Sequence, residues 1–178
     1  MSFAEPTLIG EGFVGSGPNA AHLNVVLGRK GGPVETAWVT ALATPRQGHA
    51  AFVATLQPNL PVEPLTLFVN KADIRGEDHA HLTWGAAQAG VARGVAEAVA
   101  GGLVPREEVD DLLLIAAVWV DWSANDADEV YENNARATRA ALEAAAAGRP
   151  ALDEILAALE TPFNAFFRPR SREAPEMR

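Results

Sequence analysis

The stretch Leu112–Val120, with the sequence LLLIAAVWV, decides the fold of this chain. It is a continuous apolar run of strand length, and such runs are typical of strands that are covered on both faces of their sheet. We therefore predict a central strand with helices on both sides of it. The run is half as long as the ~18 residues that a membrane-spanning helix needs, and no apolar run is longer, so we expect no membrane span.

Outward from this strand, hydrophobic periodicity predicts an alternation of strands and helices. Pro33 suits the first position of a helix. Gly85, Gly90 and Gly94 lie inside one predicted helix, where glycine is unfavourable, so they indicate either a break or close packing against a neighbour. The expected strands are His22–Leu27 (closed by Gly28), Ala50–Leu56, Leu65–Lys71 and Leu112–Val120, and the expected helices are Pro33–Thr44, Asp78–Ala100, Asp126–Ala147 and Leu152–Leu159.

The chain has no internal repeat and no linker long enough to divide it. We predict a single α+β or α/β domain whose sheet is covered by Ala-rich helices. The domain is expected to span residues 1–160, followed by a C-terminal tail at residues 161–178.

Composition narrows the classes of function. The net charge of −9 opposes general nucleic-acid binding, which needs a basic surface. The absence of cysteine excludes disulfides, thiolate catalysis and Cys-ligated zinc. Residues 1–6 lack the pattern of a signal peptide, and we expect a cytoplasmic protein. Arg168, Arg170, Arg172 and Arg178 are interpreted as part of a solvated tail rather than a binding arm.

Two motifs resemble ligand sites but favour structural interpretations. Gly10-x-Gly12-x-x-Gly15 matches a dinucleotide-binding pattern in letters, yet a strand rather than a helix is expected after it, so we interpret it as a tight turn of glycines with positive φ. His79 and His81 are two residues apart at a predicted helix start and point in different directions. We expect no metal site there and interpret both as polar residues of a partly exposed helix start.

Three side chains are candidates for chemistry. His22 lies where the Gly-rich segment meets a strand, a position from which an imidazole can exchange a proton with a ligand. Lys71 ends a buried strand, either as a snorkelling surface group or as a cation directed into a cleft. Gln88 lies between glycines in a helix, where an amide is either exposed or lines a pocket. From these residues alone, structural roles remain open for all three.

Taken together, these segments resemble the formaldehyde-activating enzyme family. The resemblance runs from about Gly10 to Gly148 and is weak beyond Pro150. The segments that carry it are Val14-Gly15-x-Gly17, Ala21-His22, Gly32-Pro33-x-Glu35-Thr36-Ala37, Pro58-Asn59-Leu60-Pro61, Asn70-Lys71, Gly85-x-Ala87-Gln88-x-Gly90-Val91-Ala92, Gly101-Gly102-Leu103-Val104-Pro105 and Asp110-Asp111-Leu112.

The resemblance implies an α+β fold with a mixed sheet, similar to domain 2 of ribosomal protein S5, in a ring-shaped homopentamer. It implies condensation of formaldehyde with tetrahydromethanopterin, a reduced pterin that serves as co-substrate, at a cleft between subunits, with no permanently bound cofactor. His22 falls on the family's proton donor. The positions of the family's ligand contacts fall on Asn24, Val53, Lys71, Asp73 and Gln88.

Three of these contact positions depart from the family's usual residues. Asn24 stands where aspartate is common, Val53 where leucine is common, and Asp73 where threonine is common. The changes at Asn24 and Asp73 motivate an alternative, a non-catalytic or differently specific paralogue that binds a pterin, a folate or a formaldehyde adduct. A purely structural role in a ring is a third possibility, which the presence of both His22 and Lys71 opposes.

Overall fold

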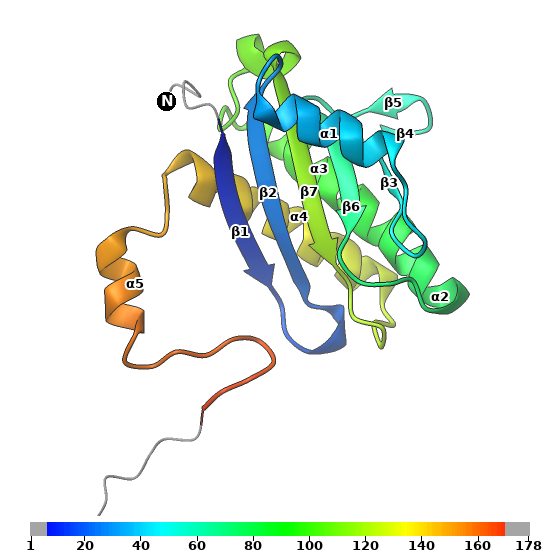
Figure 1. Cartoon of the computed structure of the whole chain (residues 1–178). Coiled ribbons are helices and arrows are strands. Elements are labelled where there is room, and N and C mark those ends of the chain that lie inside the picture. Colours follow the sequence, from blue (N-terminus) through cyan, green and yellow to red (C-terminus); the bar gives the residue numbers. More distant parts are fainter. Residues whose placement is uncertain (1–6, 170–178) are drawn as a thin grey trace, which may run out of the picture.

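The computed structural model of the chain describes residues 7–169, which form one α+β domain around a mixed sheet (Figure 1). The five-stranded sheet has the order β1-β2-β7-β6-β3. Its strands are β1 (Leu8–Val14), β2 (Ala21–Arg29), β3 (Ala51–Val53), β6 (Leu65–Asn70) and β7 (Leu112–Trp119). Only β6 and β7 pair in parallel. The short strands β4 (Thr55–Gln57) and β5 (Leu60–Pro61) form a separate hairpin.

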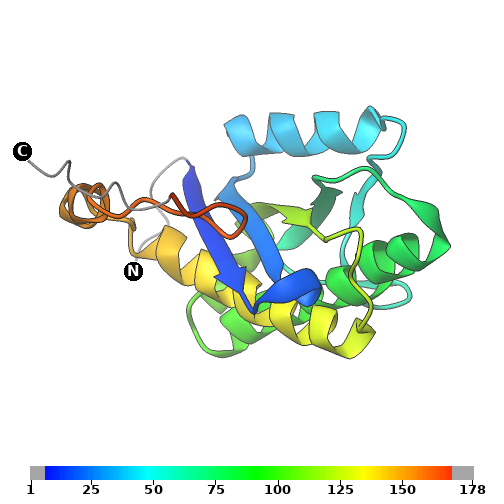
Figure 2. The same cartoon turned by 90° about the horizontal axis from the view of Figure 1, so that it is seen from below.

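The helices cover the two faces of the sheet unequally, as the view along the sheet in Figure 2 shows. Helices α3 (Gln88–Ala100) and α4 (Ala127–Ala146) lie on one face. Helix α1 (Pro33–Ala43) lies on the other and buries Val34 and Trp38 against β6 and β7. The predicted central strand is confirmed, but its two sides differ. Leu114, Ala116, Val118 and Val120 are buried, whereas Ala117 and Trp119 lie past the end of α1 and are half-buried.

The remaining elements connect or flank these layers. Helix α2 (Gly76–Ala80) continues through a π-helical segment (His81–Ala87) into α3. Short 3₁₀ turns precede β2 and β7 (Gly17–Asn19 and Arg106–Asp111). Helix α5 (Leu152–Ala158) stands apart from the body in Figure 1 and exposes its apolar residues. Within residues 7–169, no helix combines the length and the apolar composition needed to cross a membrane.

Glycines permit the tight contact of α4 with its neighbours. A Cβ atom at Gly94 would lie 2.6 Å from the carbonyl oxygen of Ala135, and one at Gly90 would lie 2.3 Å from that of Tyr131. The same holds on β1, where a Cβ at Gly12 would lie 2.1 Å from the oxygen of Ala137. The glycines of the long helix therefore mark both a π-helical break and close packing, as predicted.

Several predicted boundaries and roles are wrong. The strand β2 does not end at Gly28, because its pairing with β7 continues to Arg29. The segment Ala50–Leu56 is two strands that meet at Ala54, whose N–H donates to the Thr66 carbonyl of β6 and whose carbonyl accepts from the Val62 N–H after β5. Gly10 and Gly12 lie in β1 rather than in a turn, and it is Gly15 and Gly17 that have positive φ.

The long helix begins at Gly76 rather than Asp78, and one of its two histidines is buried. The ring of His79 accepts a hydrogen bond from the Arg75 backbone N–H at Nδ1 and lies 3.2 Å from the Val120 carbonyl at Nε2. His79 is thus a structural residue and not part of an exposed helix start. Among residues 7–169, no group of three or more His, Asp or Glu is arranged to hold a metal ion. Residues 1–6, Arg170, Arg172 and Arg178 lie outside the described residues.

Substituting alanine at two helical glycines tests the packing of α3 on α4. Gly94→Ala is expected to lower the free energy of unfolding by about 1–3 kcal/mol, because its Cβ overpacks the contact with Ala135. Gly85→Ala is the matched control. No atom outside its own helix lies within 4 Å of its Cβ position, so stability is expected to stay equal or rise by up to about 1 kcal/mol. Equal unfolding free energies for the two variants in urea would contradict the close packing.

Candidate functional site

The part of the sheet beyond α1 carries the polar candidates. The registers place Phe13 opposite His22 and His22 opposite Trp119, while Glu11 is opposite Asn24. Because side chains alternate along a strand, these residues share the face on which α1 lies. Helix α1 covers the other end of this face, over Val26, Leu113 and Ile115 among others. His22 and Asn24 therefore face a part of the sheet that α1 leaves open.

Two close polar contacts organise this open area. Nε2 of His22 lies 2.7 Å from Oε1 of Glu11. Nζ of Lys71 donates a hydrogen bond of 2.7 Å to Oδ1 of Asn24. Lys71 directly follows β6, and its backbone N–H donates to the Val118 carbonyl of β7 at 2.7 Å, which directs the lysine across β7 toward β2. We call Glu11, His22, Asn24 and Lys71 the polar cluster.

The environment of Lys71 weakens its basicity. Much of the side chain is accessible to solvent, but partial burial of the ammonium against the sheet lowers the pKa of Lys71 below its ordinary value of 10.5. The negative charge of Glu11 acts in the opposite direction and raises this pKa, but by less. The carboxylate of Glu11 therefore interacts with His22 by direct contact and with Lys71 through its charge.

An aromatic wall lies beside His22. The ring centroid of Phe13 is 6.0 Å from that of His22, and the ring of Trp119 meets Phe166 edge to face at 4.9 Å. Phe166 belongs to the C-terminal segment, which in this way returns to the sheet. A hollow of about 340 Å³ lies between these aromatic rings and the loop of Gly15 to Gly17.

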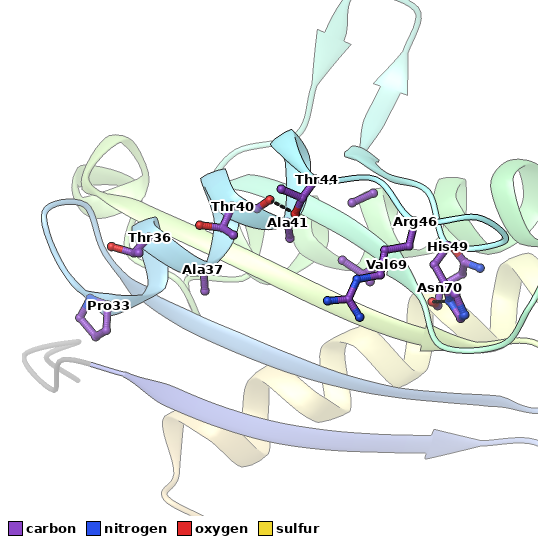
Figure 3. Close-up of a pocket in the computed structure, with 11 residues that line it drawn as sticks. Pro33, Thr36, Ala37, Thr40, Ala41, Thr44, Arg46, His49, Val69 and Asn70 are labelled. Atoms are coloured by element: carbon purple, nitrogen blue, oxygen red, sulfur yellow. Dashed lines mark hydrogen bonds between the residues drawn. The ribbon is translucent and has the colours of Figure 1, made fainter.

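A larger groove of about 650 Å³ runs along α1 (Figure 3). Its floor includes Ala51 and Val69, and Thr36 and Thr40 line it from the helix. Val69 is opposite Ala117, which is itself opposite Asn24, so the floor continues on the same face toward the polar cluster. A largely apolar groove with hydroxyl groups at its side and charged groups at one end is the ordinary form of a small-molecule site.

The other predicted contact residues lie elsewhere in the chain. Asp73 pairs with His49, whose Nε2 is 2.7 Å from Oδ1 of Asp73. Val53 lies under α1 in the apolar cluster around Trp38. The side chain of Gln88, at the start of α3, donates a 2.9 Å hydrogen bond to the Thr55 carbonyl. Since β3 is three strands from β2, Val53 is at least about 14 Å from His22. Of the six predicted residues, the fold brings together His22, Asn24 and Lys71.

Comparison with known proteins assigns the chain to a family. Residues 9–167 match the model of the family described as formaldehyde-activating enzyme (Fae). The chain belongs to the formaldehyde-activating enzyme family. The resemblance inferred from short motifs is thus confirmed, and the match extends into the C-terminal segment that carries Phe166.

Two kinds of relative are similar to this chain. It is 46% identical over 151 residues to the 5,6,7,8-tetrahydromethanopterin hydro-lyase of Methanosarcina barkeri, an alignment that covers 85% of each protein. It is 40% identical over 149 residues to the bifunctional enzyme Fae/Hps of Methanococcoides burtonii, and 35% identical over 158 residues to that of Archaeoglobus fulgidus. These two alignments cover 84% and 89% of this chain, but only 38% and 40% of the respective bifunctional proteins.

Within this family member, both changes of charge are matched by a local partner. Asn24, where the family commonly has aspartate, accepts a hydrogen bond from Lys71, so the contact survives without the charge. Asp73, where the family commonly has threonine, faces the imidazole of His49. The other ring nitrogen of His49 lies 2.9 Å from the carbonyl of Asn70, so the ring lies between two oxygen atoms. The carboxylate of Asp73 is therefore not an unpaired charge.

Glu11, whose side chain contacts His22, is absent from the site residues predicted from the sequence. The surrounding glycines suggested a turn, so the alternation that places Glu11 and Phe13 on one face was not recognised as a strand. Interpreted as a strand, Leu8–Val14 would have predicted a carboxylate and an aromatic ring on the face opposite Gly10 and Gly12.

The basicity of Lys71 is testable because the chain has only one other lysine, Lys30. After ¹³C-dimethylation of a Lys30→Arg variant, the NMR signal of Lys71 should titrate below the ordinary value of 10.5. Adding Glu11→Gln should lower the midpoint further, because Glu11 raises the pKa of Lys71. A midpoint that rises in the double variant would contradict the assigned sign of the Glu11 effect.

Proposed function

We propose that this chain joins formaldehyde to tetrahydromethanopterin to form methylene-tetrahydromethanopterin and water, as an enzyme of the lyase class. The observation that carries the proposal is its 46% identity, over 85% of both chains, to a tetrahydromethanopterin hydro-lyase. The polar cluster supports it, because it provides a proton donor and a cation on an open sheet face next to a groove. The reaction serves one-carbon metabolism and formaldehyde detoxification.

The chemistry requires help with proton transfer. One amine of the carrier adds to formaldehyde to give a carbinolamine, which loses its hydroxyl group to give an iminium ion. The second amine then attacks the same carbon and closes the methylene bridge. Hydroxide is a poor leaving group, so a proton must reach the hydroxyl oxygen as the C–O bond breaks. General acid catalysis of this kind typically contributes about 10²–10⁴-fold, and His22 is the proposed acid.

The other site residues bind and orient the carrier. Lys71 presents a cation beside Asn24, and Asn24 itself offers an amide that donates and accepts. The groove along α1 has an apolar floor suited to a planar ring, and holding both reacting nitrogens near one carbon accelerates closure by proximity. These steps use the protein's own acid and binding groups, so we propose that no permanently bound cofactor takes part.

We further propose that the active form is a homopentamer with sites between subunits. The positions of Val53, three strands away from His22, and of Gln88, which bonds the Thr55 carbonyl from α3, support this, because a site where two copies meet can bring such separated residues to one carrier. The exposed apolar residues Ile155, Leu156 and Phe163 also suit burial in an assembly. The same proposal includes a cytoplasmic location and a fold similar to domain 2 of ribosomal protein S5. It also includes a domain at residues 1–160 that is followed by a tail at residues 161–178.

The alternative function, a paralogue that binds a pterin, a folate or a formaldehyde adduct without turnover, has weaker support. It rested on the changes of charge at Asn24 and Asp73. Asn24 keeps a hydrogen bond with Lys71, and the carboxylate of Asp73 is paired with His49. Neither change removes the contact between His22 and Glu11.

A rate assay tests the catalytic role of His22. With formaldehyde held low and tetrahydromethanopterin present, the protein should form the methylene adduct faster than the spontaneous reaction does. His22→Ala should lower the catalysed rate about 10²–10⁴-fold, because the proton donor is lost. The exposed His81 provides the control variant His81→Ala, which should retain the full rate. No acceleration by the folded wild-type protein would favour the binding paralogue.

Sedimentation velocity tests the assembly. At micromolar concentration, the protein should sediment as one species of about five times the 18.8 kDa chain. A stable monomer that is fully active would exclude a site shared between subunits.

A further inference from the structure

The contact between Glu11 and His22 calls for a functional explanation. The side chains keep 65% and 28% of their solvent exposure, respectively. Exposed ion pairs contribute little to stability, so folding gains little from this one. Glu11 nevertheless lies on the edge strand with its oxygen 2.7 Å from the ring of the proposed proton donor.

We propose that Glu11 is a positioning residue that holds His22 through Nε2, so that Nδ1 is the nitrogen that exchanges protons with the substrate. The inference rests on the proposed function. A carboxylate oxygen only accepts hydrogen bonds, so its contact with Nε2 requires a proton on that nitrogen. Nε2 then carries its proton in both the neutral and the cationic ring, and the proton that comes and goes is the one on Nδ1.

The proposed step balances as follows. The Nδ1 proton of the cationic His22 moves to the carbinolamine hydroxyl, the C–O bond breaks, and water leaves while the nitrogen lone pair forms the iminium. His22 is then neutral, with its proton still on Nε2 beside Glu11. When the second carrier nitrogen attacks the iminium carbon, it loses its proton to Nδ1, which restores the cationic ring. No oxidant or further reactant is needed.

Among the residues around His22, Glu11 is the one suited to accept a hydrogen bond from its ring. Within the polar cluster, Glu11 is the member with a carboxylate, because position 24 holds an amide whose oxygen is engaged by Lys71. Phe13 and Trp119, the cross-strand neighbours of His22, have no acceptor of comparable strength for the ring. The carboxylate also raises the pKa of Lys71, which shows that its charge reaches across the cluster.

Three variants separate positioning from substrate binding. Glu11→Ala should lower kcat about 10²-fold with the KM for each substrate changed less than about twofold. Glu11→Gln should recover part of the loss, because its amide oxygen can still accept from Nε2. Glu107→Ala is the control, since Glu107 is an exposed carboxylate in the 3₁₀ turn before β7. An unchanged kcat in Glu11→Ala, or a loss confined to KM, would overturn the proposal.

The state of the ring can be observed without turnover. In ¹⁵N-histidine-labelled protein, long-range ¹H–¹⁵N spectra should show the Nε2–H tautomer for neutral His22, and a mixture of tautomers in Glu11→Ala. A neutral His22 ring in the wild-type protein that carries its proton on Nδ1 would overturn the inference. Loss of activity in His22→Ala with a normal Glu11→Ala would remove this inference alone, whereas full activity in His22→Ala would remove the proposed role of His22 itself.

Discussion

The pairing of β7 with both of its neighbours is the constraint on which the site depends. Its antiparallel register with β2 places Trp119 opposite His22 and Ala117 opposite Asn24. Its parallel register with β6 ends where the Lys71 backbone donates to Val118. One strand therefore brings a histidine, an amide and a lysine from distant parts of the chain onto one face. A slip of one residue in either register would turn these side chains to the other face, into the core.

The unequal coverage of the sheet leaves one part of it open beside a groove. On one face, small residues of β1, α3 and α4 allow the backbones to approach closely, and this side is buried along the whole length of β7. On the other face, a single helix of 11 residues spans only part of the sheet. Its bulky anchors, Val34 and Trp38, sit over β6 and β7. The groove and the polar cluster lie where this cover ends.

The charged side chains of the polar cluster each have a close partner within the cluster. Glu11 contacts His22, while its charge partly offsets the effect of burial on Lys71. With asparagine at position 24, the lysine has a neutral hydrogen-bond partner. The carboxylate of Asp73 is paired with His49 outside the cluster.

The sequence by itself determined the family, the order of most elements and the identity of the central strand. These follow from local signals, namely periodicity, Pro33 at a helix start, and motifs such as Ala21-His22 and Asn70-Lys71. Only the tertiary structure decided that Glu11 contacts His22, that Asp73 pairs with His49, and that Val53 lies three strands away from the histidine. It also decided that Gly10 and Gly12 serve close packing in a strand rather than a turn. The physical reason is that strand register and the approach of helices are set by contacts between distant segments, which no local pattern of residues contains.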